Sequence, residues 1–430
     1  MLEVYFETYG CTANQNSSEI MKGLVRQAGL NITANPEVAD LIIINSCIVK
    51  QPTEEKIRRR LADFLKQGKK VILAGCMPRL NKDKLKKDNP NNFYMLDTSQ
   101  IKNITSIIKD TQENNYDAEK YLKKINEVKL TLPKISDSKC VGITQISEGC
   151  LGECSYCIVR LAKGKLFSYP KEKILESVKN DVQSGCKEIW ITSQDNAAYG
   201  NEEGKCLLPE LLKGMLEIPG KFHIRIGMMN PNNVLKILGE LIEIYKHPKM
   251  FKFLHIPIQS GSDSILKAMN RKYKIKDINK IISKFKKEIP EITIATDIIV
   301  GFPGETDEDF KETCNLIQEI RPEILNRSNF GARKGTPAEK LKPITSKIMN
   351  QRAEHLMKLH LEICNNLQKP YINKELDVLI DKKGFENTWL GRTENYKLVA
   401  VHSLANILGK KLKVKIKKIL PHYLMGEVSE

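Results

Sequence analysis

Three cysteines with the spacing C-x3-C-x2-C are the residues of this sequence best suited to chemistry. Cys150, Cys154 and Cys157 lie in the run EGCLGECSYCIVR. Three thiolates on one short loop suit a [4Fe–4S] cluster, whose irons are bound by cysteine. Such a triad leaves the fourth iron without a protein ligand. The alternatives are three unrelated thiols, or a zinc site that lacks one ligand.

A second triad consists of Cys11, Cys47 and Cys76, each of which follows an apolar run typical of a strand. The runs are 4–10, 41–46 and 71–75, and the helix-like stretches between them are 18–28 and 54–66. This alternation predicts a parallel sheet, and parallel sheets gather their sites at the carboxyl ends of the strands. We therefore expect the three thiols to converge and to hold a second cluster with an open iron. The alternative is that each is a small buried apolar residue.

A second strand–helix alternation begins at residue 141. Its six expected strands predict a partial (β/α)6 barrel with its chemistry at the carboxyl ends of the strands. The strands are 141–145, 188–192, 223–226, 253–258, 293–300 and 323–329, and the helices are 171–183, 231–245, 277–288 and 306–320. The C-x3-C-x2-C loop follows the first of these strands, as a barrel site requires.

Short alternating runs after residue 368 predict a small antiparallel β-barrel. The runs are 376–380, 389–392, 398–401 and 412–419. Residues 368–430 contain 12 Lys and Arg against 7 Asp and Glu. The lysine stripe, which consists of Lys411, Lys413, Lys415 and Lys417, would occupy one face of a strand. We expect it to bind RNA phosphates; the alternative is an edge strand that lysines protect from pairing.

The composition favours a polyanionic partner. The 430 residues include 69 Lys and Arg against 52 Asp and Glu, a net charge of +17, although lysine-rich surfaces also serve solubility. The length suggests two or three domains. No apolar run approaches the roughly 18 residues of a membrane span, and we expect no signal peptide. The eleven cysteines are an odd number, and six of them fall into the two metal-like triads, which argues for a reducing cytoplasm rather than a disulfide scaffold.

With both triads in view, the chain resembles the methylthiotransferases, radical S-adenosylmethionine (SAM) enzymes that insert sulfur into a C–H bond and methylate it. The resemblance covers essentially the whole chain. Its motifs are residues 6–14, 41–50, 73–78, 188–195 with 199–200, 255–262 and 296–306. Residues 45–50, 132–134 and 158–160 favour the archaeal and eukaryotic branch, which acts on tRNA carrying N6-threonylcarbamoyladenosine (t6A) at position 37.

The resemblance implies that SAM chelates the open iron of the C-x3-C-x2-C cluster and lies in a pocket of the barrel. The pocket residues that it implies are Ser193, Gln194, Asp195, Arg225, Gln259, Ser260, Ile299 and Gly301. Ile299 and Gly301 would lie beside the adenine. For each polar residue, an ordinary strand-end role is the alternative. No catalytic side chain is expected beyond the cluster ligands.

The reaction implied by the resemblance has two stages. A first SAM methylates a sulfur carried by the N-terminal cluster. A second SAM yields a 5′-deoxyadenosyl radical, which abstracts hydrogen from C2 of the modified adenosine before the methylthio group is transferred. The implied partners are the tRNA anticodon loop, an electron-donor protein and a sulfur source.

Three other functions stay open. One is a methylthiotransferase for isopentenyladenosine tRNA. Another acts on a ribosomal-protein aspartate, which the basic C-terminal segment disfavours because that target is itself basic. From a different class, the chain could be a non-catalytic iron–sulfur RNA-binding protein.

The expected organisation is an α/β chain of four segments. Residues 1–108 form the N-terminal α/β methylthiotransferase domain with the auxiliary cluster, and 109–137 are a linker. Residues 138–367 form the radical-SAM barrel with wrapping helices, and 368–430 form an RNA-binding barrel that resembles the TRAM domain.

Overall fold

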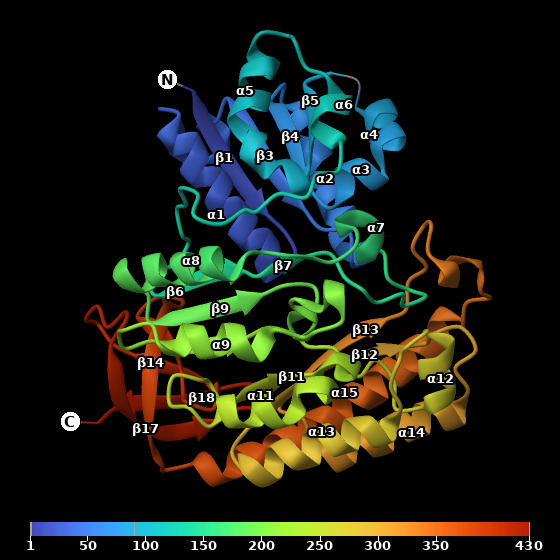
Figure 1. Cartoon of the computed structure of the whole chain (residues 1–430), viewed down its shortest axis with the longest axis vertical. Coiled ribbons are helices and arrows are strands. Elements are labelled where there is room, and N and C mark those ends of the chain that lie inside the picture. Colours follow the sequence, from blue (N-terminus) through green and yellow to red (C-terminus); the bar gives the residue numbers. More distant parts are fainter. Residues whose placement is uncertain (1, 90, 430) are drawn as a thin grey trace. The chain divides into compact units, whose positions relative to one another are not determined.

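The computed structural model describes residues 2–89 and 91–429, which form two compact units (Figure 1). The first comprises the chain up to Asp137 with Ile143–Leu151 and Cys157–Ser177. The second comprises Ser138–Gly142, Gly152–Tyr156 and the chain from Val178 onward. The C-x3-C-x2-C loop is thus divided, because Cys154 belongs to the second unit.

The first unit is built around a five-stranded parallel sheet of order β2-β1-β3-β4-β5. The strands are β1 (Glu3–Thr8), β2 (Asn31–Thr33), β3 (Leu41–Ser46), β4 (Lys70–Gly75) and β5 (Phe93–Asp97). The helices are α1 (Thr12–Gln27), α2 (Gln51–Lys66), α3 (Met77–Leu80), α4 (Lys82–Asp88), α5 (Ile104–Gln112), α6 (Ala118–Leu122) and α7 (Val159–Lys163). A short antiparallel pair, β7 (Ser147–Glu148) and β8 (Phe167–Ser168), belongs to the same unit.

Alternate residues of the central strands enter two different cores. Ile42 and Ile44 pack with residues of α2, whereas Leu41 and Ile43 pack with residues of α1 and α5. A parallel strand buried on both faces is apolar along its whole length. This is why the sequence predicts β3 and β4 correctly, while the short, polar β2 is not predicted.

Residues 109–137 pack onto the first unit, so their interpretation as a polar linker is wrong. Tyr121, Leu122 and Leu130 are buried. The amide of Ile135 donates to the Glu19 carbonyl at 2.9 Å. The buried residues are few and lie among many charged ones, so the composition of the segment does not reveal them.

Six strands form the barrel predicted from residue 141 onward, in two sheets of order β10-β9-β6 and β11-β12-β13. The pairs β9–β10, β11–β12 and β12–β13 are parallel. They are β6 (Val141–Gln145), β9 (Glu188–Thr192), β10 (His223–Ile226), β11 (Phe253–His255), β12 (Thr293–Val300) and β13 (Ile324–Asn329). β11 is shorter than expected because Pro257, which cannot donate to a ladder, follows it. The fold class predicted from the sequence is therefore confirmed.

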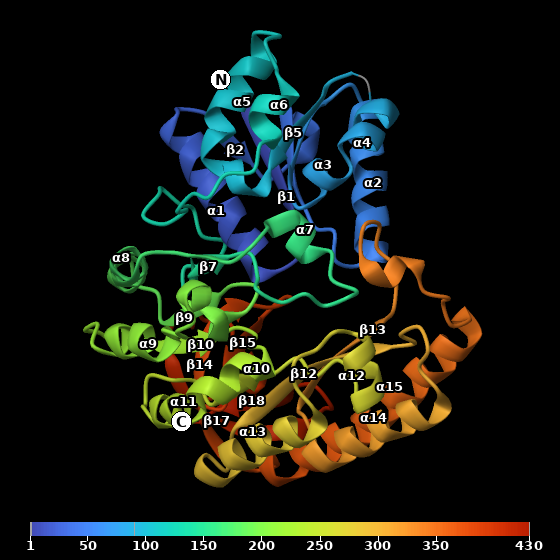
Figure 2. The ribbon, with the colours of Figure 1, turned by 45° about the vertical axis from the view of Figure 1, so that its right-hand side comes forward.

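Helices connect these strands. They are α8 (Lys171–Gln183), α9 (Leu208–Leu216), α10 (Pro231–Val234), α11 (Leu238–Tyr245), α12 (Asp263–Ala268), α13 (Ile275–Glu288), α14 (Asp307–Ile320) and α15 (Ser346–Gln368). The single helix expected over 231–245 is interrupted by a 3-10 turn at Leu235–Ile237. α15 packs against β13 and α14, and so closes one side of the barrel (Figure 2).

The C-terminal strands form a closed barrel of order β14-β15-β16-β18-β17. They are β14 (Glu375–Lys383), β15 (Thr388–Arg392), β16 (Leu398–His402), β17 (Lys411–Ile419) and β18 (Leu424–Val428), of which β18 is not predicted from the sequence. Because β17 pairs with both β14 and β18, it is not an edge strand. The interpretation of the lysine stripe as protection of an edge is therefore wrong.

Residues 393–397, the Tyr396 turn, cover the N-terminal ends of the radical-SAM strands. The Tyr396 ring lies 4.9 Å from that of Phe251 and 4.8 Å from that of Phe253. The hydroxyl of Thr293, the first residue of β12, donates to the Asn395 carbonyl at 2.6 Å. The C-terminal barrel is thus packed into the floor of the larger one, at the end opposite the expected site.

Candidate functional site

Cys11, Cys47 and Cys76 follow β1, β3 and β4, which are neighbours in the sheet. Cys47 and Cys76 are 7% and 8% exposed, whereas Cys11 is exposed. Gly10 has φ +104°, and a Cβ on it would lie 2.7 Å from Cys47 Cβ and 3.0 Å from Cys47 Sγ. Only glycine allows the Cys11 loop to approach Cys47 this closely.

Asn14, in the first turn of α1, holds the three cysteine loops together. Its Nδ2 donates to the carbonyls of Tyr9 and Ser46, each at 2.9 Å. Its Oδ1 accepts from the thiol of Cys76 at 3.9 Å, and its carbonyl accepts from Asn45 Nδ2 at 2.8 Å. One side chain therefore fixes loops that are more than 60 residues apart in the sequence.

A buried ion cluster lies beside this triad. Glu148 accepts from Lys129 at 2.8 Å and from Lys163 at 3.2 Å, and both ammonium groups also bind Thr98. Burial opposes ionisation of Glu148, but the two lysines lower its pKa to about 2. Burial raises the pKa of the Cys76 thiol to about 12, and the charge of Lys163 opposes this rise. Two cations for one anion leave an excess of positive charge that favours bound thiolate.

Cys154 is held by the residues at the end of α12. The Ser155 amide donates to the Met269 carbonyl and its hydroxyl to the Ala268 carbonyl, both at 3.0 Å. Asn270, in a left-handed conformation at φ +56°, donates from Nδ2 to the Glu153 carbonyl at 2.7 Å. These bonds immobilise the backbone on both sides of Cys154.

Arg271 reaches the cysteine itself, and sequence reasoning missed it. Its Nη1 donates to Cys154 Sγ at 3.2 Å. The two residues are 117 positions apart, and no spacing signals their contact. A sequence signal exists only in the run Met-Asn-Arg-Lys-Tyr after α12, where an arginine lies in a loop of the barrel.

Ser193, Gln194 and Asp195 follow β9, as predicted. Ser193 Oγ is buried and has no hydrogen-bond partner within residues 2–89 and 91–429. Asp195 is buried, and both of its carboxylate oxygens are occupied: they accept from the amide and Nδ2 of Asn230 at 2.9 Å and from Nδ2 of Asn233 at 2.8 Å. Ser193 thus remains available to a ligand, whereas Asp195 anchors the next strand-end loop.

Gln259 and Ser260 follow β11. Gln259 adopts φ +74°, and its amide donates to the Asp297 carbonyl at 2.7 Å. The Ser260 hydroxyl is buried 3.4 Å from that of Thr313 and accepts from the Ser262 amide at 3.2 Å. These contacts shape the loop between β11 and α12, and a role in binding SAM stays a prediction.

Ile299 and Gly301 lie at the end of β12. Ile299 is half-buried and belongs to an apolar cluster with Tyr156 of the cysteine loop and Met269. Gly301 has φ +77°, and a Cβ on it would lie 2.2 Å from Met349 Cγ. Within the second unit, Ile299 is therefore an apolar surface next to the Cys154 segment, as the adenine side of a SAM pocket requires.

Arg225 lies in β10, and the structure places its side chain among aromatic rings. The guanidinium carbon is 5.0 Å from the ring centre of Phe253, 5.4 Å from that of Trp190 and 5.7 Å from that of Tyr396. The Tyr396 turn covers the floor of the barrel, so these contacts lie in its lower half. The structure thus packs the Arg225 side chain among aromatic rings in the lower half of the barrel. A contact between Arg225 and SAM stays a prediction.

The lysines of β17 point outward, alternating with buried Val414 and Ile416. Lys413 Nζ lies 3.3 Å from Asp377 and Lys417 Nζ lies 3.3 Å from Glu427. Lys411 and Lys415 form no ion pair with the described residues. They are the two lysines of the stripe whose charge is not offset by a partner.

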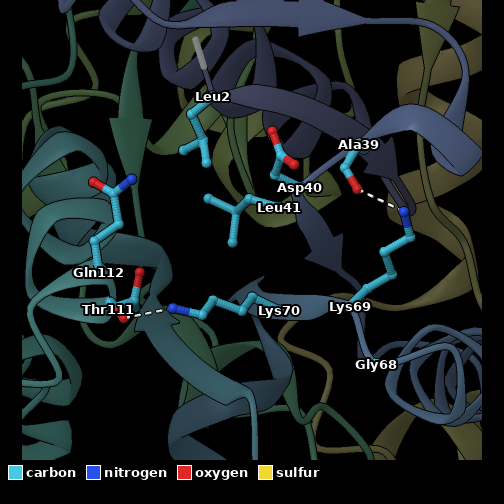
Figure 3. A pocket seen from close by; sticks show the side chains of 9 residues that line it. All are labelled: Leu2, Ala39, Asp40, Leu41, Gly68, Lys69, Lys70, Thr111 and Gln112. Atoms are coloured by element: carbon cyan, nitrogen blue, oxygen red, sulfur yellow. Dashed lines mark hydrogen bonds between the residues drawn. The ribbon is translucent and has the colours of Figure 1, made fainter.

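A pocket of about 460 Å³ lies at the amino ends of the strands of the first sheet, whereas the cysteines follow their carboxyl ends (Figure 3). Leu41 and Lys70 line it at the start of β3 and β4, and Lys70 Nζ donates to the Thr111 carbonyl at 3.0 Å. The pocket therefore takes no part in the chemistry of the triad.

The chain matches relatives over its full length. It is 39% identical to a protein called probable threonylcarbamoyladenosine tRNA methylthiotransferase from Pyrococcus horikoshii, over 100% of both chains. It is 35% identical to the threonylcarbamoyladenosine tRNA methylthiotransferase of Xenopus laevis, over 99% of this chain and 77% of that one. The chain belongs to this family. Family models also match: the radical SAM superfamily over residues 144–317, the uncharacterized protein family UPF0004 over 3–97, and the TRAM domain over 369–429.

Solved structures of other proteins share the fold of this chain. The radical S-adenosylmethionine methyltransferase TsrM from Kitasatospora setae, with cobalamin and a [4Fe–4S] cluster bound, has a TM-score of 0.57 and 12% identity over 79% of this chain and 77% of that one. The cobalamin-dependent radical enzyme OxsB has a TM-score of 0.56 and 11% identity over 83% of this chain and 56% of that one. At these identities the likeness concerns the fold alone.

The residues of this chain fit the cofactors of the radical SAM superfamily, SAM and a [4Fe–4S] cluster. A guanidinium donor faces Cys154 Sγ, which suits a thiolate, and the unpartnered Ser193 Oγ suits a polar ligand. Among the described residues, no three His, Cys, Asp or Glu side chains are arranged to hold a single metal ion. A cubane instead takes each thiolate on a different iron, so its cysteines stand farther apart.

No helix of the described chain is long and apolar enough to cross a membrane.

Proposed function

We propose that this chain converts t6A at position 37 of tRNA into its 2-methylthio derivative, using SAM and two [4Fe–4S] clusters. Cys150, Cys154 and Cys157 would hold the radical-SAM cluster. Cys11, Cys47 and Cys76 would hold the auxiliary cluster. The observation that carries the proposal is the joint presence of both triads in a chain that aligns end to end with relatives of that name.

When bound, the clusters supply the electron that cleaves SAM and the site at which sulfur is methylated. The protein binds and orients the reactants. Ser193 offers a hydroxyl to SAM and Ile299 an apolar wall for its adenine. Asn14 and Gly10 bring the Cys11 and Cys47 loops together. The excess charge of Lys163 and Lys129 stabilises an anionic cluster.

The substrate is an anticodon-loop base, which is already partly unstacked and so costs less to present than a base in a duplex. The lysine stripe would contact the phosphates of this RNA. Such contacts strengthen binding without reading sequence, so the base itself is recognised elsewhere. An electron-donor protein and a sulfur source complete the partners of the reaction.

The product of the reaction tests this function. Unmodified, t6A-containing and isopentenyladenosine-containing tRNAs are each incubated anaerobically with the reconstituted chain, SAM and dithionite, and the nucleosides are identified by mass spectrometry. We expect 2-methylthio-t6A from the t6A substrate alone. A product only from isopentenyladenosine tRNA would assign the rival substrate. In a parallel reaction that supplies ribosomal proteins instead of tRNA, a methylthiolated aspartate would assign the aspartate-modifying activity. If 5′-deoxyadenosine is absent from every reaction, SAM is not cleaved, and the chain is a non-catalytic RNA-binding protein.

The two lysines without ion-pair partners give a prediction for RNA binding. Each phosphate contact on single-stranded RNA contributes a slope of about −0.7 to the dependence of log K on log salt. Replacing both residues, as Lys411→Gln with Lys415→Gln, is therefore expected to make the slope about 1.4 less negative and to weaken tRNA binding. Affinity measured at several salt concentrations checks this.

The matched control is Lys280→Gln with Lys284→Gln, which removes the same charge from exposed positions of α13. Lys413→Gln with Lys417→Gln should have a smaller effect, because Asp377 and Glu427 already offset these charges. Point changes are preferable to a truncation at residue 368, which would also uncover Phe251 and Phe253. An unchanged slope in the Lys411/Lys415 variant would mean that the stripe is only solvated.

A further inference from the structure

We propose that Arg271 is a positioning residue that sets the reduction potential of the cluster held by Cys154. The proposal rests on the proposed function, in which Cys154 is a cluster ligand. It goes beyond that function because it assigns the residue that makes this cluster easier to reduce. The geometry that carries it lies entirely within the second unit.

Each edge of the Arg271 guanidinium has a fixed partner. Nη1 donates to Cys154 Sγ at 3.2 Å, and Nη2 donates to Asn230 Oδ1 at 2.6 Å and to the Pro257 carbonyl at 3.3 Å. Nε donates to the Tyr273 hydroxyl at 2.8 Å, and the guanidinium carbon lies 4.8 Å from the centre of that ring. A long flexible side chain is thereby held in one orientation, with one N–H directed at the sulfur.

The partner Asn230 is itself fixed by Asp195. Asp195 Oδ1 accepts from the Asn230 amide and Oδ2 from its Nδ2, both at 2.9 Å. This leaves Asn230 Oδ1 directed at Arg271. The chain of contacts Asp195–Asn230–Arg271–Cys154 explains why a buried carboxylate lies at the end of β9 while offering no free oxygen to SAM.

The chemistry follows from charge. Hydrogen bonds to the cysteine sulfurs are among the factors that set the potential of an iron–sulfur cluster, and outer residues tune a metal through its ligands. One-electron reduction adds a negative charge to the cluster. A guanidinium stays charged at any physiological pH, so its N–H stabilises the reduced form more than the oxidised one. Arg271 therefore raises the potential, which favours electron transfer to the cluster.

The test is a redox titration followed by electron paramagnetic resonance. The full chain carries Cys47→Ala, so that only the barrel cluster contributes to the signal. In this background, Arg271→Met is expected to lower the ratio of reduced to oxidised cluster at a fixed potential about tenfold, which is a shift of about 59 mV in the midpoint potential for one electron. Arg271→Lys keeps the positive charge but loses the planar fork of guanidinium N–H donors, so it should shift the midpoint potential less. Lys267→Met is the matched control, because Lys267 is an exposed cation on α12, and should leave the midpoint unchanged.

A midpoint unchanged in Arg271→Met with its iron retained would overturn the proposal. If Arg271→Met loses its iron, Asn230→Ala is measured instead. This variant keeps Arg271 but removes the Asn230 oxygen that Nη2 binds. An unchanged midpoint potential in Asn230→Ala would also overturn the proposal. Failure of the proposed function looks different. In that case the Cys47→Ala background itself shows no cluster signal, or the cluster titrates normally while the parent chain makes no methylthiolated nucleoside.

Discussion

Cys154→Ala is expected to remove about half of the iron, about four of about eight atoms per chain, and to abolish reductive cleavage of SAM. The physical reason is that, in the proposed function, only three thiolates hold the radical-SAM cluster and its fourth iron has no protein ligand. Loss of one thiolate leaves too few ligands for a stable cubane. Iron analysis after anaerobic reconstitution and chromatography of 5′-deoxyadenosine measure the two effects.

Cys206→Ala is the matched control, because Cys206 is a half-buried cysteine of the second unit outside both triads. It should keep all of the iron and the SAM cleavage of the parent chain. If Cys154→Ala still produces 5′-deoxyadenosine, the assignment of Cys150, Cys154 and Cys157 as cluster ligands is wrong.

Cys47→Ala is expected to separate the two halves of the reaction. The auxiliary cluster should be lost, because the proposed function makes Cys47 one of its three thiolate ligands. The proposed ligands of the barrel cluster do not include Cys47, so reductive cleavage of SAM should continue. The variant should yield 5′-deoxyadenosine but no methylthiolated nucleoside, as shown by mass spectrometry of digested t6A-containing tRNA.

Cys314→Ala provides the comparison for this variant, since Cys314 is as buried as Cys47 at 7% exposure but lies on α14. It should make the full product. Retained methylthiolation in Cys47→Ala would contradict the two-cluster model. Cys11, Cys47 and Cys76 would then be packing residues, as the alternative interpretation of their sequence has it.

The sequence predicts the elements whose side chains carry a periodic signal. β3 and β4 are apolar throughout because both faces are buried, and the lysines of β17 alternate with buried Val414 and Ile416. The three residues of β2 and the strand β18 lack such a signal. Both depend on neighbouring strands to complete their hydrogen bonds, so only the folded sheet reveals them.

The site is predictable where a motif places chemistry on one loop, and less so where distant segments meet. The cysteine positions follow from spacing and strand ends. Arg271 meets Cys154 only because α12 ends beside the cysteine loop. Asp195 is correctly placed at the end of β9, but its hydrogen bonds to Asn230 and Asn233 depend on the adjoining loop. Tertiary contacts of this kind leave no trace in the local pattern of residues.

The Tyr396 turn also has a consequence for the order in which a new chain is made. Tyr396 is added 143 residues after Phe253, the ring that it covers. At about 5–20 residues per second, a ribosome needs roughly 7–30 s to bridge that interval. The parallel strands of the barrel are therefore translated before their floor exists. Closure of this floor therefore lags the synthesis of the strands by at least that interval.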